Sequence, residues 1–273
     1  MIDAATRLVL TAGLVYSYRF PFSTSVILDQ GRIAWIGDDG GLSGQLLDSD
    51  VIIDCEGALI APMFFDAMLP PLEHADPGIG AGFLQVGERL ELRHKGADGQ
   101  WSQYRHHSGP QQTHAFVDRG GLTQHDVDEL LASRAFAVVR PQTDPTVLSA
   151  LASSGVPFAY GSFSESGTPW QWLRNGVYSG PEGLSARAAF NAATRSGWRM
   201  AGLPEAGELA IGSDSSMCLW ECEHLEVQVP DERVRAWSTD VRAGTPPLPD
   251  LRPDAQLPTL TATVIDGVFR KAD

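Results

Sequence analysis

The chain has 273 residues, of which 43% are hydrophobic and 20% charged, so we expect a packed globular core rather than an intrinsically disordered chain. The formal net charge is −14 and the sequence pI is about 4.8. An acidic surface of this size repels phosphate backbones and anionic lipids, so we expect neither a nucleic-acid partner nor a membrane partner.

Targeting signals and cysteine usage both favour a cytoplasmic protein. The first 20 residues contain a short apolar run without a basic leader or a small-residue cleavage site, which predicts a strand rather than a signal peptide. No apolar run approaches the roughly 18 residues that a membrane-spanning helix requires. The three cysteines, Cys55, Cys218 and Cys222, do not suggest a disulfide framework.

Short strands and tight turns are predicted at both ends of the chain. "SVILDQGRIAWIG" predicts a hairpin in which Gly31 supplies the positive φ of the turn. "DVIIDCEGALIAP" predicts the same arrangement, with its turn at residues 55–57. The C-terminal quarter again predicts short strands joined by a tight turn, here at Asp266 and Gly267. Together the two ends predict one β-domain assembled from both termini.

The middle of the chain alternates between helix and strand. Thr123 and Asp144 are predicted helix N-caps, and Gly155 lies just past the end of the second helix. A third helix is predicted in "LSARAAFNAATRSG", closed by Gly197, with "AFAVV" and "VPFAYGS" as intervening strands. This alternation predicts parallel β/α units. The Pro-rich residues 244–258 are predicted to form a surface loop or linker.

Three segments in this order resemble the amidohydrolase superfamily, and most closely its imidazolonepropionase and cytosine-deaminase-like branches. They are "VILDQGRIAWIG", "IDCEGALIAPMFFDAM" and "LSARAAFNAATRSGWRMAGLPEAGELAIGSDSSMCLWE", and the resemblance covers roughly residues 7–70 and 114–222. It implies a metal-dependent barrel set on a β-sandwich that is built from both chain ends.

From the resemblance we expect an α/β fold with two parts. Residues 1–64 and 205–273 would form the composite β-sandwich domain, and residues 65–204 a truncated TIM-barrel-like β/α domain. A complete (β/α)₈ barrel takes at least ~200 residues, so the second range is too short to build one.

The sequence departs from the family at the positions that hold the metal. Family members end their first barrel strand in Pro-Gly-Phe-(Ile/Val)-Asp-x-His-x-His, and the two histidines bind a divalent cation such as zinc. Here Asp66 is followed by Met68 and Pro70 at the histidine positions, and Phe163 stands where the family has a ligand Asp. A thioether is a weak donor for such a cation, and the prolyl ring and the phenyl group have no donor. We therefore predict no metal site and no cofactor.

A few side chains remain as candidates for a site. His114 falls at a position where the family has a histidine, whereas Arg140 lies where the next one is expected. The catalytic candidates are His114, Glu73 and His74, because an imidazole and a carboxylate near a barrel mouth can perform general acid–base chemistry. The substrate-binding candidates are Asp66, Arg140 and Trp170. For each of these candidates the competing interpretation is a charged side chain solvated in a loop or an ordinary packing role.

The two cysteines and the histidine of "CLWECEH" suggest a zinc site, but strand geometry argues against one. Residues four apart on a straight strand lie ~13 Å from each other, too far to share one metal. Cys218 and Cys222 are therefore predicted to be buried thiols.

Two functional hypotheses follow. The leading one is a pseudoenzyme: the fold is partly kept, catalysis is lost or impaired, and the protein binds a small molecule or a partner chain. The alternative is an active hydrolase of non-peptide C–N bonds, in a cyclic amide, amidine or ureide, with a non-standard site around His114. A half barrel exposes strand edges, so we also expect a homo-oligomer or a partner chain that covers the open edge.

Overall fold

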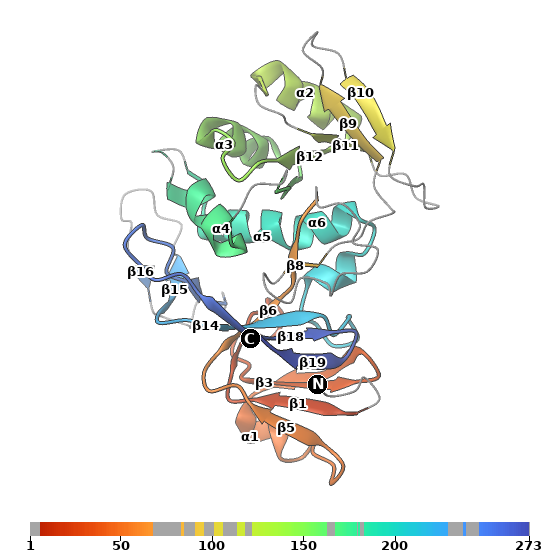
Figure 1. Cartoon of the computed structure of the whole chain (residues 1–273), viewed down its shortest axis with the longest axis vertical. Helices are drawn as coiled ribbons and strands as arrows, with labels where there is room; N and C mark the ends of the chain where they lie inside the picture. The colour runs from red at the N-terminus through yellow and green to blue at the C-terminus, as the bar shows by residue number, and fades with distance from the viewer. Residues whose placement is uncertain are drawn as a thin grey trace.

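The computed structural model describes residues 6–67, 83–84, 91–95, 101–105, 114–117, 122–162, 167–178, 180, 183–228, 237–238 and 246–272. These residues form a mixed α/β structure. Figure 1 shows its layers along the long axis: two sheets at the bottom, a group of helices in the middle, and a further sheet with its own helices at the top. No helix in the described ranges has the length and apolar character needed to cross a membrane.

N-terminal residues alone form the first sheet. Its strands, in the order β4-β3-β1-β5, are β1 (Leu8–Thr11), β3 (Ser25–Asp29), β4 (Arg32–Gly37) and β5 (Val51–Asp54). The predicted hairpin is confirmed: β3 and β4 pair antiparallel, and Gln30 and Gly31 in their turn both have positive φ. The short helix α1 (Asp39–Leu42) follows β4.

Strands from both ends of the chain form the second sheet. In the order β19-β18-β14-β6-β2 they are β2 (Leu14–Val15), β6 (Leu59–Pro62), β14 (Met217–Glu221), β18 (Thr259–Ile265) and β19 (Val268–Lys271). β6 pairs antiparallel with β14, so the early and late parts of the chain lie side by side. The turn at Asp266 and Gly267 joins β18 to β19 as predicted.

The turn at residues 55–57 is present but does not make the predicted hairpin. Glu56 and Gly57 both have positive φ, as a sharp reversal requires. However, β5 pairs with β1 in the first sheet, whereas β6 pairs with β14 and β2 in the second. The hairpin prediction was wrong because turn residues show where a chain reverses, not which strand it pairs with afterwards.

The two sheets bury side chains in one hydrophobic cluster. Leu8 and Leu28 enter it from the first sheet, and Ile60, Leu219 and Val264 enter it from the second. All five are at most 3% exposed. Burial of this apolar surface holds the two sheets together.

The remaining strands and helices form a β/α region above these sheets (Figure 1). Its sheet has the order β10-β9-β11-β12-β13 and consists of β9 (Glu91–Lys95), β10 (Trp101–Arg105), β11 (His114–Val117), β12 (Phe136–Val139) and β13 (Phe158–Tyr160). The helices are α2 (Gln124–Ser133), α3 (Pro145–Ser154), α4 (Pro169–Tyr178), α5 (Ala186–Ala193), α6 (Arg195–Met200) and the 3₁₀ turn η1 (Pro204–Gly207).

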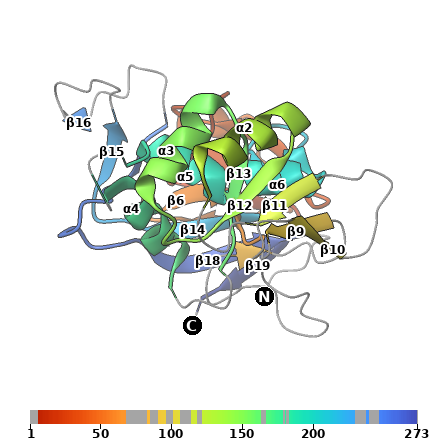
Figure 2. The same ribbon diagram turned by 90° about the horizontal axis from the view of Figure 1, so that it is seen from above.

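The predicted parallel β/α units are confirmed for β11, β12 and β13, which pair in parallel. Figure 2 shows these strands in a row from above, with α2 and α3 over them. Thr123 caps α2 in a capping box with Asp126, and Asp144 caps α3, which ends at Gly155 with a φ of 74°. The local sequence thus determines where both helices begin and where α3 ends.

Gly197 does not close the third predicted helix. α5 ends at Ala193, and Gly197 lies inside the next helix, α6, against Phe65. A Cβ at Gly197 would come within 2.2 Å of Phe65 Cδ1. The glycine therefore permits close packing of helix on strand, a role that local sequence signals do not distinguish from a helix stop.

Within the described ranges the sheet of β9 to β13 is open, and no closed barrel is seen. The strand β7 (Phe64–Phe65) pairs in parallel with β8 (Phe83–Leu84). Just beyond β7, the Ala67 N–H donates to the Tyr160 carbonyl at 2.9 Å, which places the end of β7 beside the end of β13. The division into domains at residues 64/65 and 204/205 stays a prediction.

A further small sheet contradicts part of the prediction that residues 244–258 form a surface loop. Its order is β16-β15-β17, and it comprises β15 (Leu225–Gln228), β16 (Trp237–Ser238) and β17 (Leu248–Pro249). Leu248 and Leu251, within the predicted surface loop, are 7% and 1% exposed. Arg174 of α4 donates to the Leu251 carbonyl, so this Pro-rich stretch packs against a helix rather than lying free on the surface.

Candidate functional site

The ends of β7, β12 and β13 meet at one edge of the β/α region. We call this place the strand edge and define it as Asp66, Ala67, Arg140, Gly161 and Ser162. Gly161 extends the pairing of β13 with β12, because its N–H donates to the Val139 carbonyl at 2.9 Å. Carboxyl ends of parallel strands are the usual location of sites in α/β proteins, so the strand edge is where chemistry is expected.

The Asp66 side chain forms a hydrogen bond with the protein backbone at this edge. Its side chain is 2% exposed, and its Oδ1 accepts a hydrogen bond of 2.9 Å from the backbone N–H of Ser162. The next residue, Ala67, makes the backbone bond to Tyr160 described above. Asp66 therefore joins the end of β7 to the chain leaving β13, across 96 positions of sequence.

Arg140 lies at the neighbouring strand end and begins a tight turn. Its backbone N–H donates to Thr143 Oγ1 at 2.9 Å, and the Thr143 N–H donates back to the Arg140 carbonyl at 3.1 Å. The residue is half-buried. Arg140 thus adds a cationic residue to the strand edge.

His114 is at the other end of the sheet. It is the first residue of β11, which runs parallel to β12, whereas Arg140 follows the last residue of β12. A strand rises about 3.3 Å per residue, so the backbone of His114 lies ~10 Å from the carboxyl end of its own strand. The backbone of His114 therefore lies toward the opposite end of the sheet from Arg140. Glu73 and His74 lie outside the described residues.

Trp170 belongs to the core. It is 0% exposed and sits in an aromatic cluster with Phe64, Phe190 and Trp220. Its ring stacks on Phe190 with centroids 5.8 Å apart and meets Trp220 edge-on at 5.5 Å. The packing interpretation accounts for its position, because this cluster ties α4 and α5 to β7 and β14.

The prediction of a buried thiol is confirmed for Cys218 but only in part for Cys222. Cys218 is 0% exposed and Cys222 is half-buried. Burial raises the pKa of the Cys222 thiol to about 12, and it raises the pKa of Cys218 as well. Both thiols are therefore neutral at physiological pH, and a neutral thiol is a poor metal ligand and a poor nucleophile.

A divalent cation does not fit the described residues of the strand edge. The donors there are the Asp66 carboxylate and the Ser162 hydroxyl, beside the cationic Arg140. A catalytic zinc needs about three protein ligands. Across the described part of the chain, no group of three or more His, Cys, Asp or Glu side chains is placed to hold a metal ion.

Sequence reasoning missed Ser162 as the partner of Asp66. The signal was present, because the Gly161-Ser162 pair follows a predicted strand as Asp66 does. What the sequence could not show is that β7 and β13, far apart along the chain, end side by side. Phe163, which the resemblance placed at the acidic position, lies outside the described residues.

The chain matches no protein-family model and no curated protein sequence. Solved structures do match over nearly its whole length. An amidohydrolase from Thermotoga maritima MSB8 has a TM-score of 0.62 at 10% identity, covering 97% of this chain and 100% of that one. An enamidase described as a member of the amidohydrolase superfamily has a TM-score of 0.58 at 12% identity, covering 98% and 97%.

A third likeness is to an atrazine chlorohydrolase from Arthrobacter aurescens TC1, solved in complex with zinc. It has a TM-score of 0.59 at 10% identity and covers 96% of this chain and 94% of that one. At such low identity these likenesses show the fold alone.

Proposed function

We propose, on the premise that this chain has the amidohydrolase-superfamily fold, that hydrolysis is lost or greatly reduced in it and that it acts by binding a small molecule or a partner chain. In this proposal the two lower sheets are the β-sandwich formed by residues 1–64 and 205–273. The β/α region of residues 65–204 is then the shortened barrel.

The set of donors at the strand edge carries the proposal, because the described residues there include one carboxylate and no imidazole. A carboxylate that serves as a metal ligand or proton acceptor must present its oxygens to a cation or a substrate. Here the side chain is 2% exposed and one oxygen is occupied by a backbone N–H at 2.9 Å. Its role is therefore to hold two strand ends together.

The residue types around Asp66 support the same conclusion. The neighbouring strand ends in Arg140, whose charge opposes a bound cation. Met68 and Pro70, which follow Asp66 in sequence, offer a thioether and no donor where the family has imidazoles. The zinc in the chlorohydrolase structure thus has no matching donor set among these residues.

Metal analysis and a substrate panel test the proposal together. The protein is purified from zinc-supplemented cells, dialysed and analysed for metals, then assayed on cyclic amides, ureides, amidines and aminopyrimidines with and without added Zn²⁺. We expect far less than one metal per chain and no turnover above buffer. Stoichiometric metal with turnover of any panel member would overturn the proposal. If His114→Ala then abolished that turnover and kept the melting temperature, the active-hydrolase alternative would replace it.

A further inference from the structure

The strand β5 is the outermost strand of the first sheet. It is the last in the order β4-β3-β1-β5 and pairs with β1 alone among the described residues. Figure 1 shows it at the lower end of the molecule, with the β/α region at the upper end. We call its open side, together with residues 46–56, the β5 surface. The open side of an outermost strand is a place where another chain can pair.

The backbone of β5 has hydrogen-bonding groups that the described chain does not use. The Cys55 N–H donates to the Thr11 carbonyl of β1 at 2.8 Å, and the Val51 N–H likewise donates to the residue before β1 at 3.1 Å. Because backbone groups alternate along a strand, the N–H and C=O groups of Ile52 and Asp54 point away from β1. These groups match the backbone of one added strand, as in the recognition of peptides by strand addition.

An apolar row crosses the outer face of the first sheet and ends at β5. Its members lie opposite one another on adjacent strands, and they are Trp35, Ile27, Val9 and Ile52. Val9 and Ile27 are 0% exposed and pack with Leu42 of α1, whereas Ile52 is 53% exposed. An apolar side chain on an added strand would extend this row and bury Ile52.

Two further apolar side chains, Leu46 and Leu47, are exposed just before β5. The turn between them and β5 is held by Asp50. The Asp50 N–H donates to the Leu47 carbonyl at 3.0 Å, and the Leu47 N–H donates to the Asp50 carboxylate at 2.8 Å. This turn fixes the leucines near the start of β5, so the exposed apolar residues are grouped rather than scattered.

The β5 surface is acidic. Residues 46–57 contain Asp48, Asp50, Asp54 and Glu56 but no lysine or arginine. Arg7 pairs with Asp50 at 2.6 Å, whereas the other three acids are exposed and form no ion pair within the described part of the chain. Their charge favours a partner that carries lysine or arginine. It disfavours a second copy of this chain, which would bring the same acids against them.

We propose that the β5 surface binds an extended basic segment of a partner protein, which joins the first sheet beside β5. The backbone of the segment bonds to Ile52 and Asp54, and one of its apolar side chains covers Ile52. Its lysine or arginine side chains lie against Asp48, Asp54 and Glu56. The inference deepens the binding function proposed above and rests on it for its biological role.

Titration with a synthetic peptide tests the inference on the full-length protein. The probe is acetyl-Lys-Val-Lys-Val-Lys-Val-Lys-amide, followed by calorimetry in about 150 mM salt, which screens long-range attraction. One control peptide has glutamate in place of every lysine. The other has proline in place of the central valine, which keeps the charge but removes a backbone donor. We expect saturable binding of the probe and at least about tenfold weaker binding of each control.

Hydrogen exchange locates the bound peptide. At saturation, the backbone amides of β5 should exchange more slowly, and those of β12 should be unaffected. Absence of saturable binding, or equal binding of the proline peptide, would overturn the inference. Saturable binding without protection of β5 would place the peptide elsewhere and contradict it.

Two isoleucines of equal exposure supply matched variants. Ile52 and Ile211 are 53% and 52% exposed. Ile211 lies near β4, at the other side of the sheet, because the Gly212 N–H donates to the Ile33 carbonyl. We expect Ile52→Lys to weaken peptide binding about tenfold or more, and Ile211→Lys to weaken it by less than about twofold. If Ile52→Lys unfolds, Ile52→Thr and Ile211→Thr replace the pair. Equal losses at the two positions would contradict the assignment.

Light scattering on the same variants tests the other possible occupant, a second copy. Because opposed acids disfavour pairing of two copies here, Ile52→Lys should leave the molar mass of the parent unchanged. A dimer that this substitution dissociates would assign the β5 surface to a second copy and overturn the proposal of a basic partner. The metal analysis and these titrations measure different properties, so failure of one proposal does not resemble failure of the other.

Discussion

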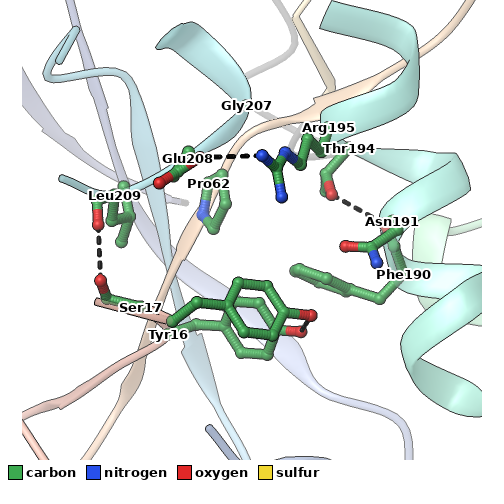
Figure 3. A pocket seen from close by; sticks show the side chains of 11 residues that line it. Tyr16, Ser17, Pro62, Phe190, Asn191, Thr194, Arg195, Gly207, Glu208 and Leu209 are labelled. Carbon is green, nitrogen blue, oxygen red and sulfur yellow. Dashed lines mark hydrogen bonds and ion pairs between the residues drawn. The ribbon is translucent and has the colours of Figure 1, made fainter. Parts of the chain in front are cut away.

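The strand edge and the contact between the second sheet and the helices α5 and α6 use their polar groups in different ways. At the strand edge, Asp66 is buried and accepts a backbone hydrogen bond that joins two strand ends. At the contact with the helices, Glu208 pairs with Arg19 and, as Figure 3 shows, with Arg195, and the hydroxyls of Tyr16 and Tyr18 bond to each other. A hydrogen bond to the backbone thus joins the segments of the first region, whereas side-chain pairs join those of the second.

The first region shows that the usual site of a fold can take a structural role in a particular chain. The carboxyl ends of parallel strands are a favourable place for chemistry only while side chains there face a cavity. When the carboxylate accepts a hydrogen bond from the backbone, the same position contributes to stability instead. The following substitutions separate these two roles, beginning with the largest expected effect.

Trp170→Ala tests whether Trp170 serves packing or ligand binding. Because the ring is fully buried among three other aromatic rings, its loss should lower the free energy of unfolding by ~3–5 kcal/mol. Urea unfolding followed by circular dichroism measures this, with Trp170→Phe as the milder control. A variant as stable as the parent would remove the packing assignment and return Trp170 to the substrate-binding candidates.

Gly197→Ala tests the contact between α6 and β7. Alanine favours a helix over glycine by ~1 kcal/mol, but overpacking of a core costs ~1–3 kcal/mol. The new Cβ would lie 2.2 Å from Phe65 Cδ1, so the steric cost should dominate, with a net loss of about 2 kcal/mol.

Gly44→Ala is the matched control, because the nearest atom to its new Cβ is 4.0 Å away. Thermal or urea unfolding of the two variants should therefore differ clearly. If Gly197→Ala were as stable as Gly44→Ala, the helix would not pack on Phe65 as described.

Asp66→Ala tests the structural role of the carboxylate. It leaves the buried Ser162 N–H without its acceptor, which should cost about 1–3 kcal/mol of unfolding free energy. Asp66→Asn keeps an acceptor oxygen and should lose less. Unchanged stability in Asp66→Ala, measured by urea unfolding, would show that the carboxylate is not needed to join the strand ends.

The smallest effect concerns pH. Burial, assisted by the neighbouring Tyr18 hydroxyl, raises the pKa of Tyr16 well above its usual value, while Arg187 opposes the shift. A raised pKa keeps the phenol protonated as pH rises, so it remains a hydrogen-bond donor. The ultraviolet absorbance of phenolate should therefore rise equally in the parent and in Tyr16→Phe between pH 7 and about pH 9.5. A larger rise in the parent than in Tyr16→Phe over this range would contradict the shift.

Local signals in the sequence predicted local structure well. The hairpin around Gly31, the caps Thr123 and Asp144, and the end of α3 at Gly155 follow from residue chemistry within one turn of the chain. The predicted hairpin after residue 57 failed because the partner of β6 is β14, about 160 positions later. Helix periodicity likewise could not reveal that Gly197 faces Phe65.

The candidate site likewise has some features that the sequence predicts and others that it does not. The absence of imidazoles at positions 68 and 70 was visible in the sequence, because it concerns residue type alone. The burial of Asp66 against Ser162, and the meeting of Tyr16 with Arg195 and Glu208, depend on contacts between distant segments. Such contacts are determined by tertiary packing, which residue spacing does not encode.

Anomalous scattering at the zinc edge, from crystals grown with excess zinc, tests the central claim most directly. The account predicts no anomalous peak within bonding distance of Asp66 and an intact hydrogen bond from Ser162. A peak at the strand edge bound by three or more protein side chains would show that the metal centre survives, and the proposal that hydrolysis was lost with it would fail.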